Sequence, residues 1–537
     1  MSKTVTAEPV GLRQSMAWIH GWLGLIAGWI LFAMFLTGTA SYFRPEITRW
    51  MQPEIDLRPV APATSASTAV AHLQKVAPTA EQWYIYLPDA RTTATRVFVR
   101  ERPDPDPNAK PAPRRPELRL DPATGEELTA RDTRGGEHFY RFHFQLQIPH
   151  PWGRWLAGLC AMAMLAAIIS GVITHKRIFV DFFTLRWGKG QRSWLDAHNV
   201  SAVVALPFHA MITYTGLITL VAMYMPWPIE ANYKDPATFQ AAVFGAEAEA
   251  EGGASGRFAA LTPVAPLIAR ASQEWGGGRP ETMVVRNPND GAATITLFQS
   301  TKDRLNARSG SIVFSGVDGR LLSASPPAGP AVETSGVMLG LHIGSFAGPM
   351  LRWTFFLLGL AGTAMVGTGL VLWTVKRKRP DAAPFFGIRL AERLNVGAIA
   401  CLPAGMAAFL LANRLLPTTM AGRADTEVAI MFWTWFGLAA IACLRPIRRA
   451  WVETLAIAAI AFLALPLVNA LTTDRDLFRS LSKGDGLFVA FDLAMLATAA
   501  LLGFAAWRTA QVSSRPVRRK RATPAPVAPL REAIDAP

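Results

Sequence analysis

Long apolar runs dominate the alternation of hydrophobic and polar positions along this chain. A helix needs roughly 20 apolar residues to cross the hydrocarbon core of a bilayer, which is about 30 Å thick. Eight segments approach or exceed that length: 16–43, 155–174, 202–224, 353–373, 396–416, 428–444, 451–471 and 487–507. The pattern therefore predicts an all-α membrane bundle of about eight transmembrane helices, of which the sixth is the shortest.

Basic residues follow every second predicted span. They lie at 176–192 after the second span, 376–379 after the fourth, 445–449 after the sixth and 515–521 after the eighth. Because short basic connections stay in the cytoplasm, the pattern predicts a multi-pass bacterial inner-membrane protein with both termini cytoplasmic. The net charge of +15 then reflects topology and contact with the lipid bilayer, and no nucleic-acid partner is expected.

Two long polar segments, 44–150 and 225–350, are predicted to face the periplasm. Each contains strand-like alternation, at 83–87 and 293–297, and each is expected to form an α+β domain. Residues 102–116 are rich in proline and charge and are predicted to be an unordered insert. The remaining layout is 1–43 for the N-terminus and first helix, 151–224 for the second and third, 351–376 for the fourth, 394–508 for four additional helices and 509–537 for a basic, disordered tail.

The first four spans contain an internal repeat. At an offset of 178 residues, His20 aligns with His198 and Thr37-Gly38 aligns with Thr215-Gly216. Further along, His143 falls near His342, and Ser170-Gly171 matches Thr368-Gly369. Each copy contains two spans, so the copies should run parallel around a pseudo-twofold axis along the membrane normal.

Histidine is concentrated in this repeat, which carries seven of the nine histidines in or at the edge of its spans. A pseudo-twofold axis would bring His20 toward His198 at one end of the bundle and His143 toward His342 at the other. Two facing imidazoles can supply both axial ligands of a b-type haem, so the pattern predicts two haems per chain. Small residues one turn beyond the first pair, Gly24 and Ala202, leave room for a flat ring or for close helix packing.

Two further histidines are secondary candidates for the same chemistry. His209 would lie about 16 Å beyond His198 if both belonged to one continuous helix, where it would ligate haem or line the path between haems. His175 sits at the cytoplasmic edge of the second span, where it would bind a haem propionate, replace one ligand or face lipid headgroups. A zinc site would need three or four converging ligands, and these spans show no matching spacing.

The same residues carry a resemblance to a known family. His20-Gly-Trp-Leu-Gly-Leu, the run from His175 through His209 to Gly216, and Leu341-His342-Ile-Gly344 resemble the PepSY-associated transmembrane family in order and spacing over residues 15–376. The resemblance implies two periplasmic PepSY domains, a four-helix core and a link to iron uptake. It also implies similarity to di-haem ferrisiderophore reductases, with His20, His143, His198 and His342 at the family's recurrent histidine positions.

The leading hypothesis is a transmembrane electron-transfer protein of the ferric-chelate reductase type. A cytoplasmic or membrane electron donor would supply the inner haem, and a ferric siderophore or other ferric chelate in the periplasm would be reduced at the outer one. The alternatives are a PepSY-based regulatory, peptidase-inhibiting or ligand-sensing protein, and a transporter.

Overall fold

The computed structural model describes residues 11–103, 117–175, 180, 182, 184–233, 235, 238–239, 253–327, 329–378 and 383–511. Most of the predicted unordered insert, at 104–116, lies outside the described residues. So do the basic residues Lys176, Arg177 and Arg379 and the predicted disordered tail from residue 512 onward.

Seven described helical segments are long and apolar enough to cross a membrane. They are α1 (Leu12–Ser41), α5 (Trp152–Thr174), α14 (Pro349–Arg377), the run Phe386–Leu415, α17 (Arg423–Leu444), α18 (Ile447–Thr472) and α20 (Gly486–Gln511). The run Phe386–Leu415 consists of α15 (Phe386–Val396), η1 (Gly397–Cys401) and α16 (Leu402–Leu415). The chain is therefore a helical, multi-pass membrane protein, as the apolar runs predicted.

The third predicted span is not one straight helix. Helix α7 (Gln191–Val204) and helix α8 (Leu206–Thr219) meet at a bend of 68° around Ala205, and α9 (Val221–Tyr224) and α10 (Trp227–Asn232) continue the chain. Pro207 lies in the first turn of α8, where its ring can neither donate a backbone hydrogen bond nor fit against a preceding helical turn. The prediction that His198 and His209 share one continuous helix axis is wrong for this reason.

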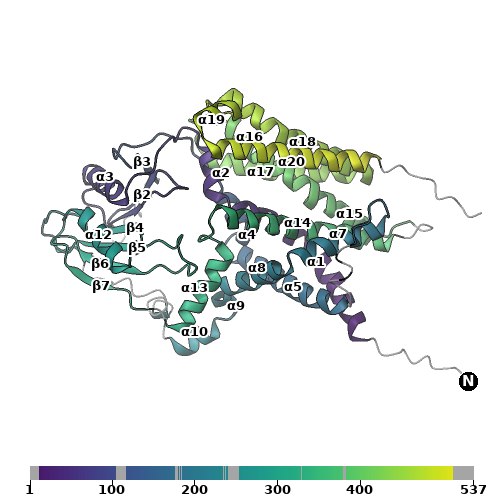
Figure 1. Ribbon diagram of the computed structural model, residues 1–537, viewed down its shortest axis with the longest axis horizontal. Helices are drawn as coiled ribbons and strands as arrows, with labels where there is room; N and C mark the ends of the chain where they lie inside the picture. The colour runs from purple at the N-terminus through teal and green to yellow at the C-terminus, as the bar shows by residue number, and fades with distance from the viewer. Residues whose placement is uncertain are drawn as a thin grey trace, which may run out of the picture.

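The first four membrane segments pack as one unit. Helix α1 contacts α5 and α14, α7 contacts α14, and α8 contacts α5 and α13 (Pro330–Ile343). The last four segments form a second group along one side of this unit, capped by α19 (Leu477–Lys483) (Figure 1). The two groups are joined by Trp29, whose Nε1 donates to Asn395 Oδ1 at 2.9 Å, and by the stacked rings of Trp50 and Phe491, 4.3 Å apart.

Seven strands form a single antiparallel sheet at one end of the molecule (Figure 1). Their order is β3 (Leu118–Leu120), β2 (Thr95–Arg100), β1 (Gln82–Tyr86), β4 (Pro280–Arg286), β5 (Thr294–Gln299), β6 (Ser311–Ser315) and β7 (Leu321–Ala324). Helices α3 (Pro62–Val76) and α12 (Val264–Glu274) contact each other and bury their apolar faces in the same core as the sheet. The alternation at 83–87 and 293–297 thus predicted two real strands, β1 and β5.

The two polar segments do not form two separate domains, because β1 pairs with β4 and joins them into one sheet. At the centre of that pair, Tyr84 lies opposite Val284. One hydrophobic core includes residues of both segments, such as Trp83, Ile85, Met283 and Val285, all fully buried. Pairing β1 with β4 removes an exposed edge from each half, which gives the physical reason for the joint sheet.

Three short helices lie between the sheet and the membrane helices: α2 (Arg44–Met51), α4 (Glu137–Gln145) and α13. The sequence placed His143 and His342 at the openings of the second and fourth spans, but they lie on α4 and α13. Helix α4 ends where Leu146 and Gln147 adopt positive φ angles of 55°, and α13 ends at Gly344 with φ 66°. Since such angles cannot continue a right-handed helix, α5 and α14 start afresh beyond them.

Candidate functional site

The structure brings His20 on α1 close to His198 on α7, at the end of the bundle away from the sheet. The two ring centres are 6.1 Å apart, with 66° between the ring planes. His20 Nδ1 lies 2.8 Å from the carbonyl oxygen of Ala167 on α5, and His198 Nδ1 lies 2.8 Å from that of Met365 on α14. We call these two histidines the sheet-distal pair.

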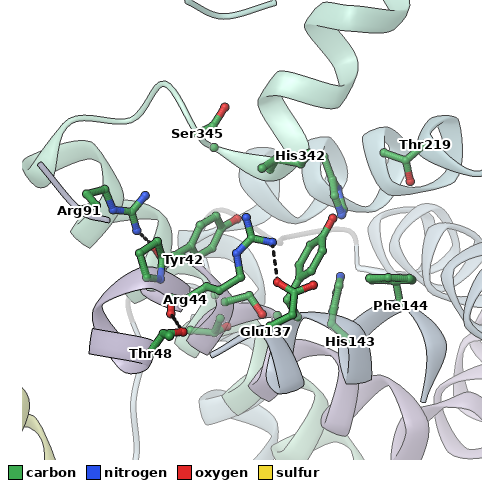
Figure 2. Close-up of a pocket in the computed structure, with 18 of the residues that line it drawn as sticks. Tyr42, Arg44, Thr48, Arg91, Glu137, His143, Phe144, Thr219, His342 and Ser345 are labelled. Carbon is green, nitrogen blue, oxygen red and sulfur yellow. Dashed lines mark hydrogen bonds and ion pairs between the residues drawn. The ribbon is translucent and has the colours of Figure 1, made fainter. Parts of the chain in front are cut away.

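A second pair, the sheet-proximal pair, consists of His143 on α4 and His342 on α13. Its ring centres are 6.0 Å apart, with 30° between the planes. His143 Nδ1 lies 2.7 Å from the Met34 carbonyl oxygen, and His342 Nδ1 lies 3.0 Å from the Ile212 carbonyl oxygen. Figure 2 shows the two imidazoles approaching from opposite sides of a cavity.

All four histidines are held by the same device at positions that the repeat relates. Met34 and Ile212 are 178 residues apart, the offset that aligns His20 with His198. A carbonyl oxygen can only accept, so each Nδ1 carries the proton and donates it. Each Nε2 is then the nitrogen with a free lone pair, which is the form of imidazole that binds a metal.

A glycine lies against each of the four rings. A methyl group added at Gly38 would lie 2.6 Å from His143 Nδ1, and one at Gly216 would lie 2.7 Å from His342 Cε1. At Gly171 and Gly369 the corresponding distances are 3.1 Å to His20 Cε1 and 3.0 Å to His198 Cε1. The repeated Thr-Gly and Ser-Gly motifs therefore mark where the histidine rings pack, a role that the sequence did not reveal.

The spacing of each pair fits two trans imidazole ligands of one metal. Metal–nitrogen bonds of about 2.0–2.1 Å, with about 1.1 Å from nitrogen to ring centre, place two such rings about 6.3 Å apart. The observed ring-centre distances are 6.1 Å and 6.0 Å. Beside the sheet-distal pair, a methyl group at Gly24 would meet nothing within 4 Å, which leaves open space next to His20.

A cavity of about 590 Å³ surrounds the sheet-proximal pair and reaches from the membrane helices to the sheet. Its inner walls are apolar and include Phe35 and Phe208. Near the histidines, Arg44 forms an ion pair with Glu137 at 3.3 Å and lies over the Tyr140 ring at 4.4 Å (Figure 2). The sequence did not single out these polar residues, because they come from different elements without a local motif.

The secondary candidates lie apart from both pairs. His209 is fully buried on α8, where its Nε2 is 3.4 Å from the Leu358 carbonyl oxygen and its Nδ1 has no hydrogen-bond partner among the described residues. Its ring packs against Phe35 at 6.0 Å. His175 Nε2 lies 3.1 Å from Asn199 Nδ2, at the end of α5.

One histidine outside the candidates has a clear structural role. His138 on α4 is buried, and its Nε2 lies 3.2 Å from Met431 Sδ on α17. Its ring centre is 5.0 Å from that of Phe409 on α16. His138 thus attaches the helix that carries His143 to the last four membrane segments. In the described part of the chain, no group of three or more His, Cys, Asp or Glu could hold a metal ion.

Comparison with known proteins places this arrangement in a family. Residues 17–376 match the family model described as the PepSY-associated TM region, which covers all four histidines of the two pairs. The chain belongs to the PepSY-associated TM family. The membrane segments from α15 to α20 lie beyond the part of the chain that matches this family.

A relative of this PepSY-associated TM protein is found in Pseudomonas aeruginosa. It is the uncharacterized protein PA4219, 24% identical over 323 residues. The matched region covers 56% of this chain and 78% of the relative. The similarity supports the family and carries no statement about activity.

Proposed function

We propose that this PepSY-associated TM protein is a di-haem electron-transfer protein of the bacterial inner membrane, which reduces a ferric siderophore or other ferric chelate in the periplasm. The observation that carries the proposal is the presence of two histidine pairs, each with metal-compatible ring spacing and each with Nδ1 bonded to a backbone carbonyl. A b-type haem needs two axial ligands and supplies one-electron chemistry when bound.

The positions of the pairs support transfer across the membrane. Along α1, His20 and the Gly38 contact of His143 are 18 residues apart, which corresponds to about 27 Å of helix rise. This is close to the thickness of the hydrocarbon core, about 30 Å. One pair is thus suited to accept electrons at the cytoplasmic face, and the other is suited to release them beside the sheet.

The chain's own residues would do three things in this function. The carbonyl groups of Ala167, Met365, Met34 and Ile212 orient the imidazoles and keep Nε2 unprotonated. The glycines let the rings sit close to the helices, and the apolar inner walls of the cavity exclude water. Transfer of one electron to Fe(III) gives Fe(II), which hard oxygen ligands bind more weakly, so reduction would loosen the chelate; the electron comes from a cytoplasmic or membrane donor.

Haem content tests the proposal directly. Protein purified after expression with ample haem supply should give about two non-covalent b haems per chain in a pyridine haemochrome assay, and acid acetone should extract them. Fewer than half a haem per chain would contradict the proposal.

The pairing is tested by two substitutions with a control. His198→Ala should empty or alter the sheet-distal site and leave the other haem low-spin. His342→Ala should do the reverse and abolish reduction of an external ferric chelate. His72→Ala, in α3 of the sheet domain, should leave both haem spectra unchanged. If His198→Ala and His342→Ala perturb the same haem, the proposed pairs are incorrect.

A further inference from the structure

The cavity above the sheet-proximal pair has an excess of positive charge. Seven Lys or Arg residues line it, against three Glu residues. Five of the seven cations lie within 4.0 Å of a carboxylate that no other lining cation contacts. The two that remain are Arg96 and Arg119, which share a single carboxylate, that of Glu117.

Arg96 and Arg119 lie directly opposite each other on neighbouring strands, β2 and β3. Their distances to Glu117 are long, 3.6 Å and 3.9 Å. Arg96 Nε is buried and has no hydrogen-bond partner within the described ranges. Burial, followed by the charge of Arg96, lowers the pKa of Arg119 even though Glu117 raises it. Like charges in directly opposed positions destabilise a sheet, so this pair is an unfavourable arrangement for the strands alone.

The sheet itself does not require this charge. In the second half of the sheet, the strands that pair in the same way are β5 and β6, where Thr294 lies opposite Ser315 and Thr296 lies opposite Val313. Neutral residues are therefore compatible with the same strand pairing. The arginine pair is a property of the first half only, on the side where the cavity opens.

We infer that Arg96 and Arg119 form a binding site for the anionic oxygen groups of a soluble chelate, such as the carboxylates of a polycarboxylate. Two adjacent guanidinium groups match the geometry of carboxylate oxygens and would hold them by charge-assisted hydrogen bonds. The identity of the ligand as a metal chelate rests on the proposed function. The site would give the protein a preference for negatively charged chelates over neutral or cationic ones.

Gallium(III) citrate is a suitable probe, because gallium(III) resembles ferric iron but accepts no electron under these conditions. Binding to the full chain in detergent is measured by calorimetry, with the cationic gallium(III) complex of desferrioxamine B for comparison. Arg119→Gln and Arg96→Gln should each weaken citrate-complex binding at least about tenfold, as expected for losing a charge-assisted hydrogen bond. Arg119→Lys should retain part of the affinity, and the cationic complex should bind no more weakly.

A matched control is Arg320→Gln, which removes an exposed arginine that is not part of the cavity lining. It should leave both affinities unchanged. Because the substitution at Arg119 relieves repulsion, the melting temperature should stay the same or rise, whereas a purely structural arginine would lower it when removed.

Three results would overturn the inference. One is unchanged citrate-complex affinity in both arginine variants. Another is equal weakening of the cationic complex. The third is loss of haem from Arg119→Gln in parallel with binding, which would assign the arginines to a haem propionate instead of a soluble ligand. Since gallium binding needs no electron, chelate binding that depends on the arginines in a protein without haem would uphold this inference while refuting the proposed function.

Discussion

At the scale of single residues, the backbone determines the state of the four paired histidines. A carbonyl oxygen within 3.0 Å of each Nδ1 fixes the proton on that nitrogen and directs Nε2 away from the supporting helix. A side-chain partner would be lost by mutation, but a helix carbonyl is present whatever residue occupies the position. The paired rings therefore depend on where the helices lie more than on which side chains surround them.

The glycines that contact these rings provide a sharp test. Gly38→Ala should displace His143, because the new methyl group would lie 2.6 Å from Nδ1, and the haem at the sheet-proximal pair should be lost or become high-spin. The haem at the other pair should keep its spectrum. The measurement is the optical spectrum and the haem content of the purified variant.

Gly24→Ala is the matched control, since it is the same substitution on the same helix with nothing within 4 Å of the added group. It should leave both haems intact and stabilise α1 by about 0.5–1 kcal/mol. Equal effects of the two alanines would show that the contact with His143 is unimportant.

The sequence predicted which histidines would meet but not what would hold them. The offset of 178 residues relates His20 to His198, and symmetry then implies proximity without any knowledge of packing. The supporting carbonyls of Ala167 and Met365 belong to residues without polar side chains, so no motif identifies them. His209 was misplaced because the estimate assumed a straight helix through Pro207.

At the scale of elements, an ion-pair cluster ties the two halves of the sheet domain together. Lys302, beyond β5, contacts Asp89, between β1 and β2, and lies 2.8 Å from Glu281 on β4. Burial alone raises the pKa of Asp89, but Lys302 and the backbone N–H groups of Thr92 and Arg91 outweigh it, so the pKa lies below its ordinary value. Burial likewise opposes the charge of Lys302, but Glu281 and Asp89 raise the pKa of its ammonium group overall.

These shifts set the pH range in which the cluster stabilises the fold. The contribution of Asp89 is present above its unfolded pKa of about 3.9 and is lost as the pH falls through its lower folded value. The contribution of Lys302 is present below about 10.4 and is lost as the pH rises through its raised folded value. Stability from this cluster should therefore be constant between about pH 5 and 9.

Lys302→Met should lower the stability of the sheet domain by about 1–2 kcal/mol at pH 7, because Asp89 and Glu281 lose their shared cation. Acid unfolding of the variant should begin at higher pH, since the pKa of Asp89 is no longer held down by Lys302. Thermal unfolding followed between pH 3 and 8 measures both effects. Arg279→Met, which breaks an exposed ion pair with Asp303, should change the melting temperature little; a comparable loss in that variant would contradict the expected difference.

The elements themselves were only partly predictable. Apolar length identified the membrane helices, and alternation identified β1 and β5, because both signals are local. The short helices α4 and α13 were merged with the spans after them, since the breaks depend on positive φ angles at Leu146 and Gln147 that those residue types do not suggest. The pairing of β1 with β4 joins residues about 200 positions apart and leaves no local trace.

At the scale of the whole molecule, the sheet and the sheet-distal histidine pair lie at opposite ends of the first four membrane segments (Figure 1). Reporter fusions after Gly125 and Gly319, both turn glycines with positive φ angles, should be active in the periplasm. Fusions after Lys189 and Lys378 should be active in the cytoplasm. Reversed signals at either sheet turn would place the sheet in the cytoplasm and would contradict the proposed direction of electron flow.

The single sheet also constrains the order in which the protein is made. Strand β1 is synthesised about 190 residues before β4, so at roughly 5–20 residues per second its edge waits unpaired for about 10–40 s while two more spans are inserted. Because the β1–β4 pair is centred on Tyr84 and Val284, β1 offers a nascent neighbour the same antiparallel edge that β4 later occupies. A chain that stalls after the first half would therefore be prone to pair with another stalled half, and timely insertion of the third span protects against that dimer.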